Sequence, residues 1–216
     1  MKQIAIFGAG GFGREVKFLV DDLNKVSHEW DFIGYFDDNH SSVKKIDKKY
    51  LLGDMNTLNN WKEELSIAVA IGSSVTRRKV VAAIKNPLID FPTLIHPNAI
   101  IGNTSTVQIG EGCIICAGSI LTVDISLGKF VDLHIGCTVS HDCVIGDYCS
   151  FMPVVNISGE TSIEQGVYIG TGAKVINQIN IGEGTIVGAG AVVTKSLPSY
   201  CTAVGVPAVP IKFMKS

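Results

Sequence analysis

The chain has 216 residues, 46% of them hydrophobic, and its 18 Lys and Arg nearly balance 20 Asp and Glu to give a net charge of −2. This length supports one large domain or two small ones with a real core, and the lack of a basic run or tail argues against nucleic acid as a partner. No stretch of about 18 or more residues is uniformly apolar, so we expect no membrane span.

Residues 1–92 alternate strand and helix signals, with glycines and acidic residues between them. The expected elements are, in order, a strand over Lys2–Phe7, a helix after Gly13 with Val16, Leu19 and Val20 on one face, strands over Phe32–Phe36 and Ile67–Ile71, and a helix over Val75–Ile84. This β-α-β order predicts a small parallel sheet with helices on its faces.

The start of the chain indicates a buried first strand rather than a signal peptide, because its short apolar run ends in glycines. With no secretory signal, the six cysteines are expected to be free thiols in a reducing compartment. We therefore expect a cytoplasmic enzyme.

From Ile109 onward an apolar residue recurs at every sixth position. The series is Ile109, Ile115, Leu121, Leu127, Leu133, Val139, Ile145, Phe151, Ile157, Ile163, Ile169, Val175, Ile181, Val187 and Val193. Neither a helix nor a simple strand has a period of six, whereas hexapeptide repeats indicate a parallel β-helix. Three hexads would make one coil of 18 residues, so that residues 18 apart stack about 4.8 Å from one another.

Within each hexad the second position is often Gly and the fifth is mostly small, as expected at the corners of a three-sided prism. Cys113, Cys137, Cys143 and Cys149 all fall at the fifth position, which predicts small buried filler rather than a metal cluster. The Cys113-x-x-Cys116 spacing resembles a zinc site but has no second pair. We therefore expect no metal.

Five motifs occur in an order that resembles a known enzyme family. They are Ile6-Phe7-Gly8-Ala9-Gly10-Gly11-Phe12-Gly13 with Phe36-Asp37-Asp38, then Ala70-Ile71-Gly72, Leu94-Ile95-His96-Pro97, Val139-Ser140-His141-Asp142-Cys143-Val144-Ile145-Gly146, and Val204-Gly205-Val206-Pro207-Ala208. The match covers nearly the whole chain and resembles the sialic-acid O-acetyltransferase and nucleotide-amino-sugar N-acetyltransferase family of hexapeptide-repeat acyltransferases.

The resemblance implies an α/β nucleotide-binding domain over residues 1–92, followed by an all-β left-handed parallel β-helix over residues 93–216. The handedness comes from the resemblance alone, since the general crossover rule favours the right-handed form. It further implies a homotrimer that uses acetyl-CoA as co-substrate and acetylates a nucleotide-linked amino sugar.

The resemblance also assigns site residues. His141 matches the proposed general base, and Asp142 would raise its basicity. The nucleotide sugar would be held by Gly10, Gly11, Phe12, Asp37, Asp38 and Gly72. Acetyl-CoA would lie in a groove between subunits beside Ser150, Gly159, Thr171 and Ala189.

Three positions depart from the family pattern. Some members have a histidine at the positions of Phe12 and Ser150, and the position of His134 is asparagine in relatives. These departures bear on the sugar and the nucleobase, not on the reaction class. His134 is a further candidate for substrate contact.

Each signal also has an ordinary explanation. The Gly8-x-Gly10-x-x-Gly13 pattern fits a purely structural turn or a dinucleotide site, although about 90 residues are too few for both halves of a dinucleotide fold. His141 falls at the third hexad position, outside the aliphatic seam, and an exposed histidine without a role is the alternative there.

Three other functions remain open from the sequence. The first is O-acetylation of a sugar such as sialic acid. The second is a zinc carbonic anhydrase, which needs three histidine ligands where the coil offers only His134 and His141. The third is a non-enzymatic β-helix scaffold, for which the N-terminal domain would have no purpose.

Overall fold

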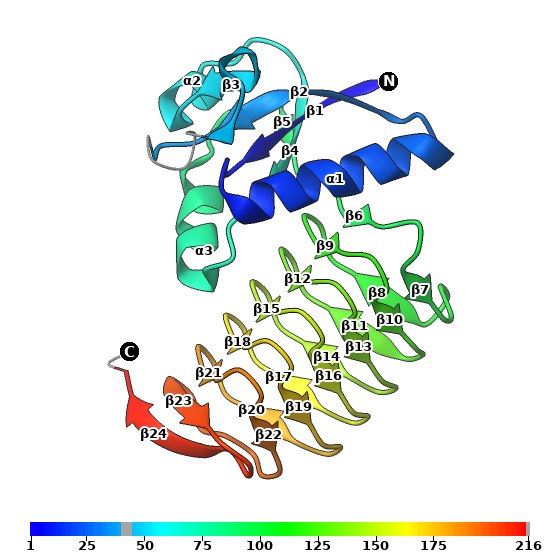
Figure 1. Ribbon diagram of the computed structural model, residues 1–216, viewed down its shortest axis with the longest axis vertical. Coiled ribbons are helices and arrows are strands. Elements are labelled where there is room, and N and C mark those ends of the chain that lie inside the picture. The colour runs from blue at the N-terminus through cyan, green and yellow to red at the C-terminus, as the bar shows by residue number, and fades with distance from the viewer. Residues whose placement is uncertain (40–44, 215–216) are drawn as a thin grey trace. The chain divides into compact units, whose positions relative to one another are not determined.

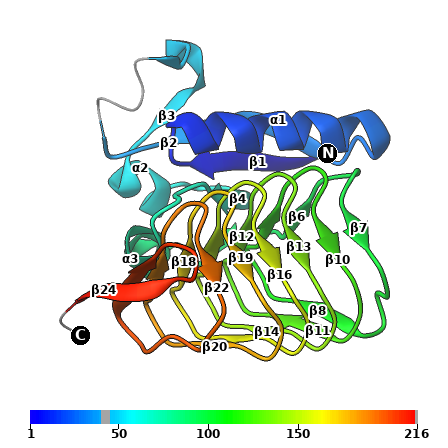
Figure 2. The same cartoon turned by 60° about the horizontal axis from the view of Figure 1, so that its bottom comes forward.

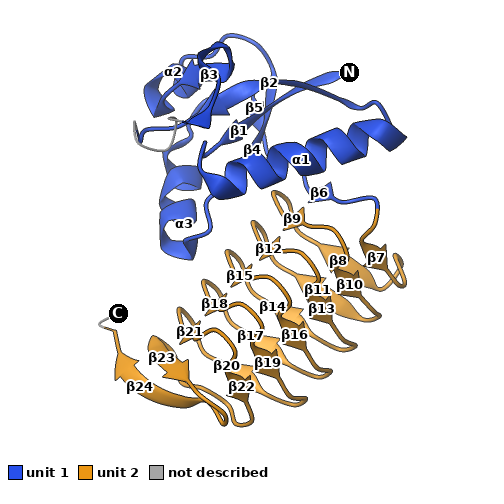
Figure 3. Ribbon diagram, in the orientation of Figure 1, with its two compact units in different colours: residues 1–97 blue, residues 98–216 orange. Residues whose placement is uncertain are grey.

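The computed structural model describes residues 1–39 and 45–214. The chain forms two compact units, Met1–Pro97 and Asn98–Ser216, called unit 1 and unit 2 below (Figure 3). Unit 1 mixes helices and strands, and unit 2 is built from short strands.

Unit 1 holds a five-stranded parallel sheet with the strand order β3-β2-β1-β4-β5 (Figure 1). The strands are β1 (Lys2–Phe7), β2 (Trp30–Phe36), β3 (Leu51–Gly53), β4 (Leu65–Val69) and β5 (Ile89–Asp90). The helices are α1 (Gly11–Val26), α2 (Met55–Asn59) and α3 (Ser74–Ala83), with a short 3₁₀ turn, η2, at Lys48–Tyr50. The parallel sheet expected from the sequence is thereby confirmed.

The long helix α1 packs through one apolar face. Val16, Leu19 and Val20 are at most 2% exposed, as their i, i+3, i+4 spacing predicts, while Lys17 and Asp21 form an ion pair at 2.6 Å whose side chains are 31% and 48% exposed. Burying each of these aliphatic side chains is worth roughly 1.5–3 kcal/mol, so this face fixes α1 on the sheet.

The central strands β1 and β4 are buried on both faces, which suits a parallel sheet covered by helices. Two strands have bounds that differ from those predicted. β2 begins at Trp30, two residues before the expected start, and β4 ends at Val69 instead of Ile71. Beyond Val69 the chain turns into the loop that caps α3, so Ile71 has left the ladder.

The His96-Pro97 segment at the end of unit 1 is anchored to α1. His96 Nε2 lies 2.9 Å from Asp22 Oδ2, and Lys25 Nζ donates to Asp22 Oδ1 at 2.6 Å. Because the His96 side chain is only 5% exposed, this bond satisfies a polar ring inside the unit.

Unit 2 is a left-handed parallel β-helix with three faces, as predicted (Figure 2). The first face consists of β7 (Ile100–Ile101), β10 (Ile120–Leu121), β13 (Thr138–Val139), β16 (Asn156–Ile157), β19 (Lys174–Val175) and β22 (Val192–Val193). The second consists of β8 (Val107–Ile109), β11 (Ile125–Leu127), β14 (Val144–Ile145), β17 (Ser162–Ile163) and β20 (Asn180–Ile181). The third contains β9 (Ile114–Ile115), β12 (Asp132–Leu133), β15 (Ser150–Phe151), β18 (Tyr168–Ile169), β21 (Ile186–Val187), β23 (Cys201–Val204) and, antiparallel to it, β24 (Val209–Phe213). One further short strand, β6 (Leu94–Ile95), ends unit 1.

The coil repeats every three hexads, as the sequence period predicts. On the first face Leu121 pairs with Val139, Val139 with Ile157, and Ile157 with Val175. From Ile115 to Val193 every sixth residue is at most 3% exposed and points into the prism. The hexad therefore supplies most of the core of unit 2.

The cysteines of unit 2 are buried filler, as expected. Cys137, Cys143 and Cys149 are at most 1% exposed, and each thiol donates to a backbone carbonyl, such as that of Met152 at 3.2 Å from Cys137 Sγ. Burial raises the pKa of Cys137 to about 11, so its thiol stays protonated at neutral pH. In the described part of the chain no three His, Cys, Asp or Glu side chains are placed to hold a metal ion.

None of the helices within residues 1–39 and 45–214 combines the length and apolar character needed to cross a membrane.

Candidate functional site

Two glycines of the turn after β1 are required by packing within unit 1. Gly8 has φ +111°, and a Cβ there would lie 2.6 Å from the carbonyl oxygen of Ala70. A Cβ on Gly13 would lie 1.8 Å from the carbonyl oxygen of Gly8. Both positions exclude a side chain, so these two glycines shape the turn itself.

Three other glycines at the same edge have no such reason. Around Gly10, Gly11 and Gly72 an added Cβ would meet no atom of residues 1–39 and 45–214 within 4 Å, and none of the three has a left-handed φ. Neither the backbone conformation nor packing among these described residues requires glycine there. These three residues were among those predicted to bind the nucleotide sugar, and the structure leaves open space beside them.

The open glycines lie where the topology predicts a ligand crevice. The chain passes from β1 to β2 on one side, and β4 lies on the other side of β1. Gly10 and Gly11 follow β1, and Gly72 follows β4, so they flank the point at which the strand order reverses. In open α/β sheets ligands bind at the carboxyl edge at such a switch point, and the N-terminus of α1 beside it favours phosphate.

The acidic pair after β2 is engaged by backbone N–H groups. Asp37 Oδ2 accepts from the N–H of Ala9 at 2.7 Å, and its Oδ1 accepts from Asn39 at 2.7 Å. Asp38 is exposed, and its Oδ1 accepts from the N–H of Met55 at 2.8 Å. Asp37 therefore ties the glycine turn to the end of β2, while Asp38 lies on the surface of unit 1.

Sequence reasoning missed a buried arginine beside Gly72. Arg77 is 0% exposed, and its Nη1 donates to the carbonyl of Ile71 at 2.6 Å. Ser73 caps the same helix, since its Oγ accepts from the N–H of Thr76 at 3.3 Å. In the sequence Arg77 looks like one of three neighbouring basic residues on a helix, and only the fold separates it from the others.

In unit 2 the predicted base and its acidic neighbour meet. His141 and Asp142 follow β13, at the corner between the first and second faces, here called the His141 corner. His141 Nδ1 lies 2.8 Å from Asp142 Oδ2, and the two side chains are 55% and 57% exposed. A carboxylate only accepts, so in the neutral ring Nδ1 carries the hydrogen and Nε2 keeps its lone pair.

The backbone places Asp142 beside the ring. Its φ is +57°, in the left-handed region, and its N–H donates to the carbonyl of Val123 at 3.3 Å. Asp124 and Glu160, one coil away on either side, and Gln178, one coil beyond Glu160, lie along the same corner and share this conformation with φ between 55° and 59°. Aspartate tolerates this region better than most residues, so the corner geometry and the carboxylate are compatible.

Gly159 lies against the ring of His141, one coil further along. A Cβ on Gly159 would lie 2.4 Å from His141 Cε1 and 2.5 Å from Nε2. Of the residues predicted to contact acetyl-CoA, Gly159 is therefore the one that the structure brings together with the predicted base.

The other predicted coenzyme residues lie elsewhere on the prism. Thr171 and Ala189 are exposed at the corner between the third and first faces, here called the Thr171 corner. Ser150 is fully buried in β15 of the third face, and His134 is buried in the turn after β12. Within one chain the first face separates the His141 corner from the Thr171 corner.

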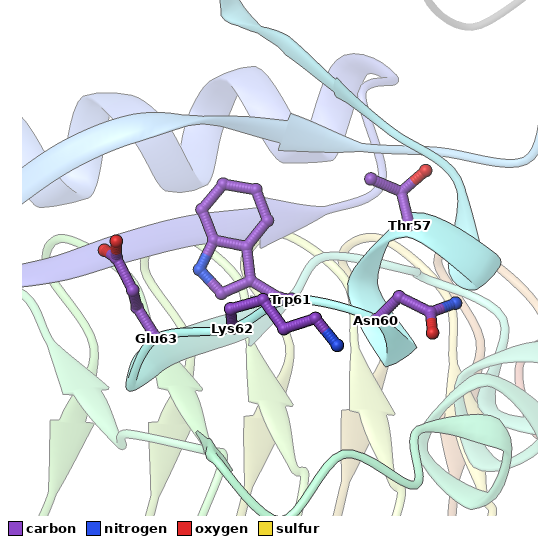
Figure 4. Close-up of a pocket in the computed structure, with 5 residues that line it drawn as sticks. All are labelled: Thr57, Asn60, Trp61, Lys62 and Glu63. Atoms are coloured by element: carbon purple, nitrogen blue, oxygen red, sulfur yellow. The ribbon is translucent and has the colours of Figure 1, made fainter.

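A pocket of about 340 Å³ opens beside the indole of Trp61 (Figure 4). It is lined by Thr57, Asn60, Lys62 and Glu63 as well. It contains none of the predicted site residues, and its residues follow or belong to α2 rather than the carboxyl edge of the sheet.

Comparisons with known proteins agree with this arrangement. The family model described as PglD N-terminal domain matches residues 3–84, and the bacterial transferase hexapeptide (six repeats) matches residues 160–195. The GDP-perosamine N-acetyltransferase of Escherichia coli O157:H7 is 34% identical over 190 residues, which cover 88% of this chain and 85% of that protein.

Solved structures match over nearly the whole chain. PerB from Caulobacter crescentus, in complex with CoA and GDP-perosamine, has a TM-score of 0.87 at 28% identity over 98% of both chains. The acetyltransferase domain of PglB from Neisseria gonorrhoeae FA1090, in complex with acetyl coenzyme A, has a TM-score of 0.86 at 30% identity, over 97% of this chain and 99% of that one.

The β-helix, the exposed His141–Asp142 pair and these matches define an acyl-CoA-dependent acetyltransferase of the hexapeptide-repeat class, with acetyl-CoA as its co-substrate. Within that class the chain belongs to the family of nucleotide-amino-sugar N-acetyltransferases that includes GDP-perosamine N-acetyltransferase. The family predicted from the five motifs is confirmed.

Proposed function

We propose that this enzyme transfers the acetyl group of acetyl-CoA to the amine of a nucleotide-linked 4-amino sugar. The observation that carries the proposal is the His141–Asp142 pair, exposed on the coil of an acetyl-CoA-dependent enzyme. A relative named for GDP-perosamine and a similar structure that holds CoA and GDP-perosamine support a nucleotide amino sugar as acceptor.

His141 acts as general base in this proposal. The acceptor nitrogen attacks the thioester carbonyl carbon and forms the new C–N bond, and Nε2 of His141 takes the proton that the nitrogen loses. The C–S bond then breaks, and the departing thiolate of CoA takes the proton that His141 now carries, which restores the neutral ring. Asp142, bonded to Nδ1 at 2.8 Å, fixes the tautomer that leaves Nε2 basic and stabilises the imidazolium.

The backbone stabilises the oxyanion in this proposal. As the tetrahedral intermediate forms, the thioester oxygen gains negative charge, and a backbone N–H of the glycine-rich coil donates a hydrogen bond to it. No metal takes part in the proposed transfer, because the thioester is already activated toward an amine nucleophile.

The nucleotide part binds at the carboxyl edge of the unit 1 sheet. Gly10, Gly11 and Gly72 leave the space into which the diphosphate and ribose fit, and Phe12 lies in the first turn of α1, next to Gly11. Asp38, which is exposed, accepts hydrogen bonds from the base or ribose, since a carboxylate has acceptor sites beyond the one that Met55 uses.

Acetyl-CoA binds between copies of the chain, which we propose form a homotrimer. His141 and Gly159 lie at one corner of the prism, and Thr171 and Ala189 lie at another. A groove that uses both corners is complete only when the His141 corner of one copy faces the Thr171 corner of a second. Analytical ultracentrifugation tests the assembly, and a monomer at micromolar concentration would contradict it.

The function is tested by following CoA release with a panel of UDP-, GDP- and dTDP-linked 4-amino sugars, with GDP-perosamine first. The expected product gains one acetyl group by mass spectrometry and resists hydroxylamine, as an amide does. A hydroxylamine-sensitive ester would show O-acetylation instead, and lack of turnover with every amino sugar would refute the proposal.

A further inference from the structure

We infer that Gly159 is a positioning residue for the base, because it leaves the space in which the His141 ring lies beside Asp142. The inference rests on the proposed role of His141. It gives Gly159 a role distinct from the coenzyme contact that the resemblance implies, and this role does not depend on bound acetyl-CoA.

The geometry at the His141 corner carries the inference. A Cβ on Gly159 would lie 2.4 Å from Cε1, 2.5 Å from Nε2 and 2.8 Å from Nδ1 of His141. All three distances are shorter than any ordinary van der Waals contact. The ring therefore occupies the volume that a side chain at residue 159 would take. Its Nε2, the proposed proton acceptor, is among the atoms nearest to that added Cβ.

The corner itself does not require a glycine at this position. Gly159 has no left-handed φ, unlike several other glycines of the coil. Every sixth residue from Glu111 to Ala189 occupies the same third position of its hexad, and Gly159 is the one glycine among them. The remaining members include bulky residues such as Ile135 and Gln165, so a side chain is compatible with the turn.

The backbone at this corner is fixed by its ladder. The carbonyl of Gly159 accepts from Gln178 N at 3.0 Å, and the next N–H, of Glu160, donates to the carbonyl of His141 at 2.9 Å. A methyl group at residue 159 cannot retreat without breaking these bonds. The ring of His141 must move instead, and it then loses the 2.8 Å contact with Asp142.

A double-mutant cycle tests the inference. Gly159→Ala should lower kcat by about 100-fold, the loss typical of a misplaced catalytic group, with a lower melting temperature. Once His141→Ala has removed the ring, the added methyl group has space. Gly159→Ala should then cause no further loss of kcat or melting temperature in the His141→Ala background.

Asn177→Ala is the matched control. Asn177 lies one coil after Gly159 at the same corner and is exposed, so its truncation should leave kcat and melting temperature unchanged. If Gly159→Ala alone fails to fold, a soluble double variant Gly159→Ala/His141→Ala still supports a clash with the ring.

Two results would overturn the inference. One is an equal fall in kcat or melting temperature on adding Gly159→Ala to wild type and to His141→Ala. The other is a rise confined to KM for acetyl-CoA, which would indicate a coenzyme contact. If His141→Ala retains full turnover, the proposed base fails, while the melting-temperature cycle still decides whether Gly159 makes room for the ring.

Discussion

Replacing Gly11 with Ala should separate stability from nucleotide binding in unit 1. The added Cβ meets no atom of the part of the chain that the structure describes within 4 Å, and Gly11 is the first residue of α1, with a helical backbone that alanine adopts. The substitution restricts the unfolded chain, so it should raise the free energy of unfolding by about 0.4–1 kcal/mol. The same methyl group fills the space proposed for the nucleotide.

The expected loss of affinity for the nucleotide sugar follows from the free energy of one charge-assisted hydrogen bond. If the methyl group keeps a phosphate from the N-terminus of α1, about 1.5–3 kcal/mol is lost, or roughly tenfold to 150-fold in affinity for the nucleotide sugar. KM for the nucleotide sugar should rise by that factor, while KM for acetyl-CoA stays unchanged.

Gly13→Ala is the control for the opposite behaviour. Its Cβ would lie 1.8 Å from the carbonyl oxygen of Gly8, so the turn and α1 must shift. Such overpacking typically costs about 1–3 kcal/mol. Both tryptophans of the chain, Trp30 and Trp61, lie in unit 1, so urea unfolding followed by tryptophan fluorescence reports on the relevant unit.

The predicted effects of Gly11→Ala on stability and on nucleotide-sugar binding can each be contradicted separately. A destabilised Gly11→Ala variant would mean that the space beside this residue is not open in the folded protein. A variant with wild-type KM for the nucleotide sugar would mean that the open space is not reserved for the ligand.

Three further predictions follow from local contacts. The thiol of Cys137, whose pKa burial raises to about 11 from 9.0, should resist iodoacetamide in the folded protein at neutral pH, and its contribution to stability should fade between about pH 9 and 11; rapid labelling of the native protein would contradict this. The hydrogen bond from Lys25 holds the pKa of Asp22 below its ordinary value of 3.8. The stability that this carboxylate contributes is therefore present above that pH and is lost as the pH falls further. In urea unfolding, Asp22→Asn should have a lower free energy of unfolding than wild type at neutral pH, and the difference should shrink below about pH 4. Asp37→Ala should destabilise unit 1 by about 1–3 kcal/mol, because the buried N–H of Ala9 loses its acceptor, whereas Asp38→Ala should mainly raise KM for the nucleotide sugar; equal effects of the two variants on KM alone would argue against this division.

The β-helix was predictable because each hexad encodes its own contribution to the core. Once Leu121, Val139 and Ile157 are known to recur once per coil, their pairing follows from the repeat. The handedness does not follow from the period, and it came from the family resemblance. The short elements β3, α2 and β5 were missed, because they have five residues or fewer and no detectable period.

The sequence predicts which residues form the site, but it does not show which of them are needed for the fold and which are open to a ligand. The glycine motif looks uniform in sequence, yet Gly13 is excluded from bearing a side chain by Gly8, while Gly10 faces open space. Asp37 and Asp38 were both expected to hold the nucleotide sugar, and both oxygens of Asp37 accept from backbone N–H groups of unit 1. Such distinctions depend on tertiary neighbours that no local pattern records.

The contact between Gly159 and His141 shows the same limit. The two residues are one coil apart, so their proximity follows from the coil length. The sequence does not show that the ring lies against this glycine while its Nδ1 contacts Asp142 at 2.8 Å. The sequence predicts both residues, and the ring contact is the reason that we infer for the glycine.

The most direct test of the central claim is the turnover of His141→Ala with acetyl-CoA and the preferred amino sugar. His141 does not point into the prism, so the variant should fold normally, and kcat should fall by roughly 10²–10⁴-fold, the usual contribution of a positioned base, while KM for acetyl-CoA stays close to that of wild type. Raising the pH should restore part of the rate, because free amine then becomes available without the base, and the buried His134 replaced by Ala should cause a smaller loss. Near wild-type turnover by His141→Ala, together with an inactive His134→Ala variant, would contradict the account.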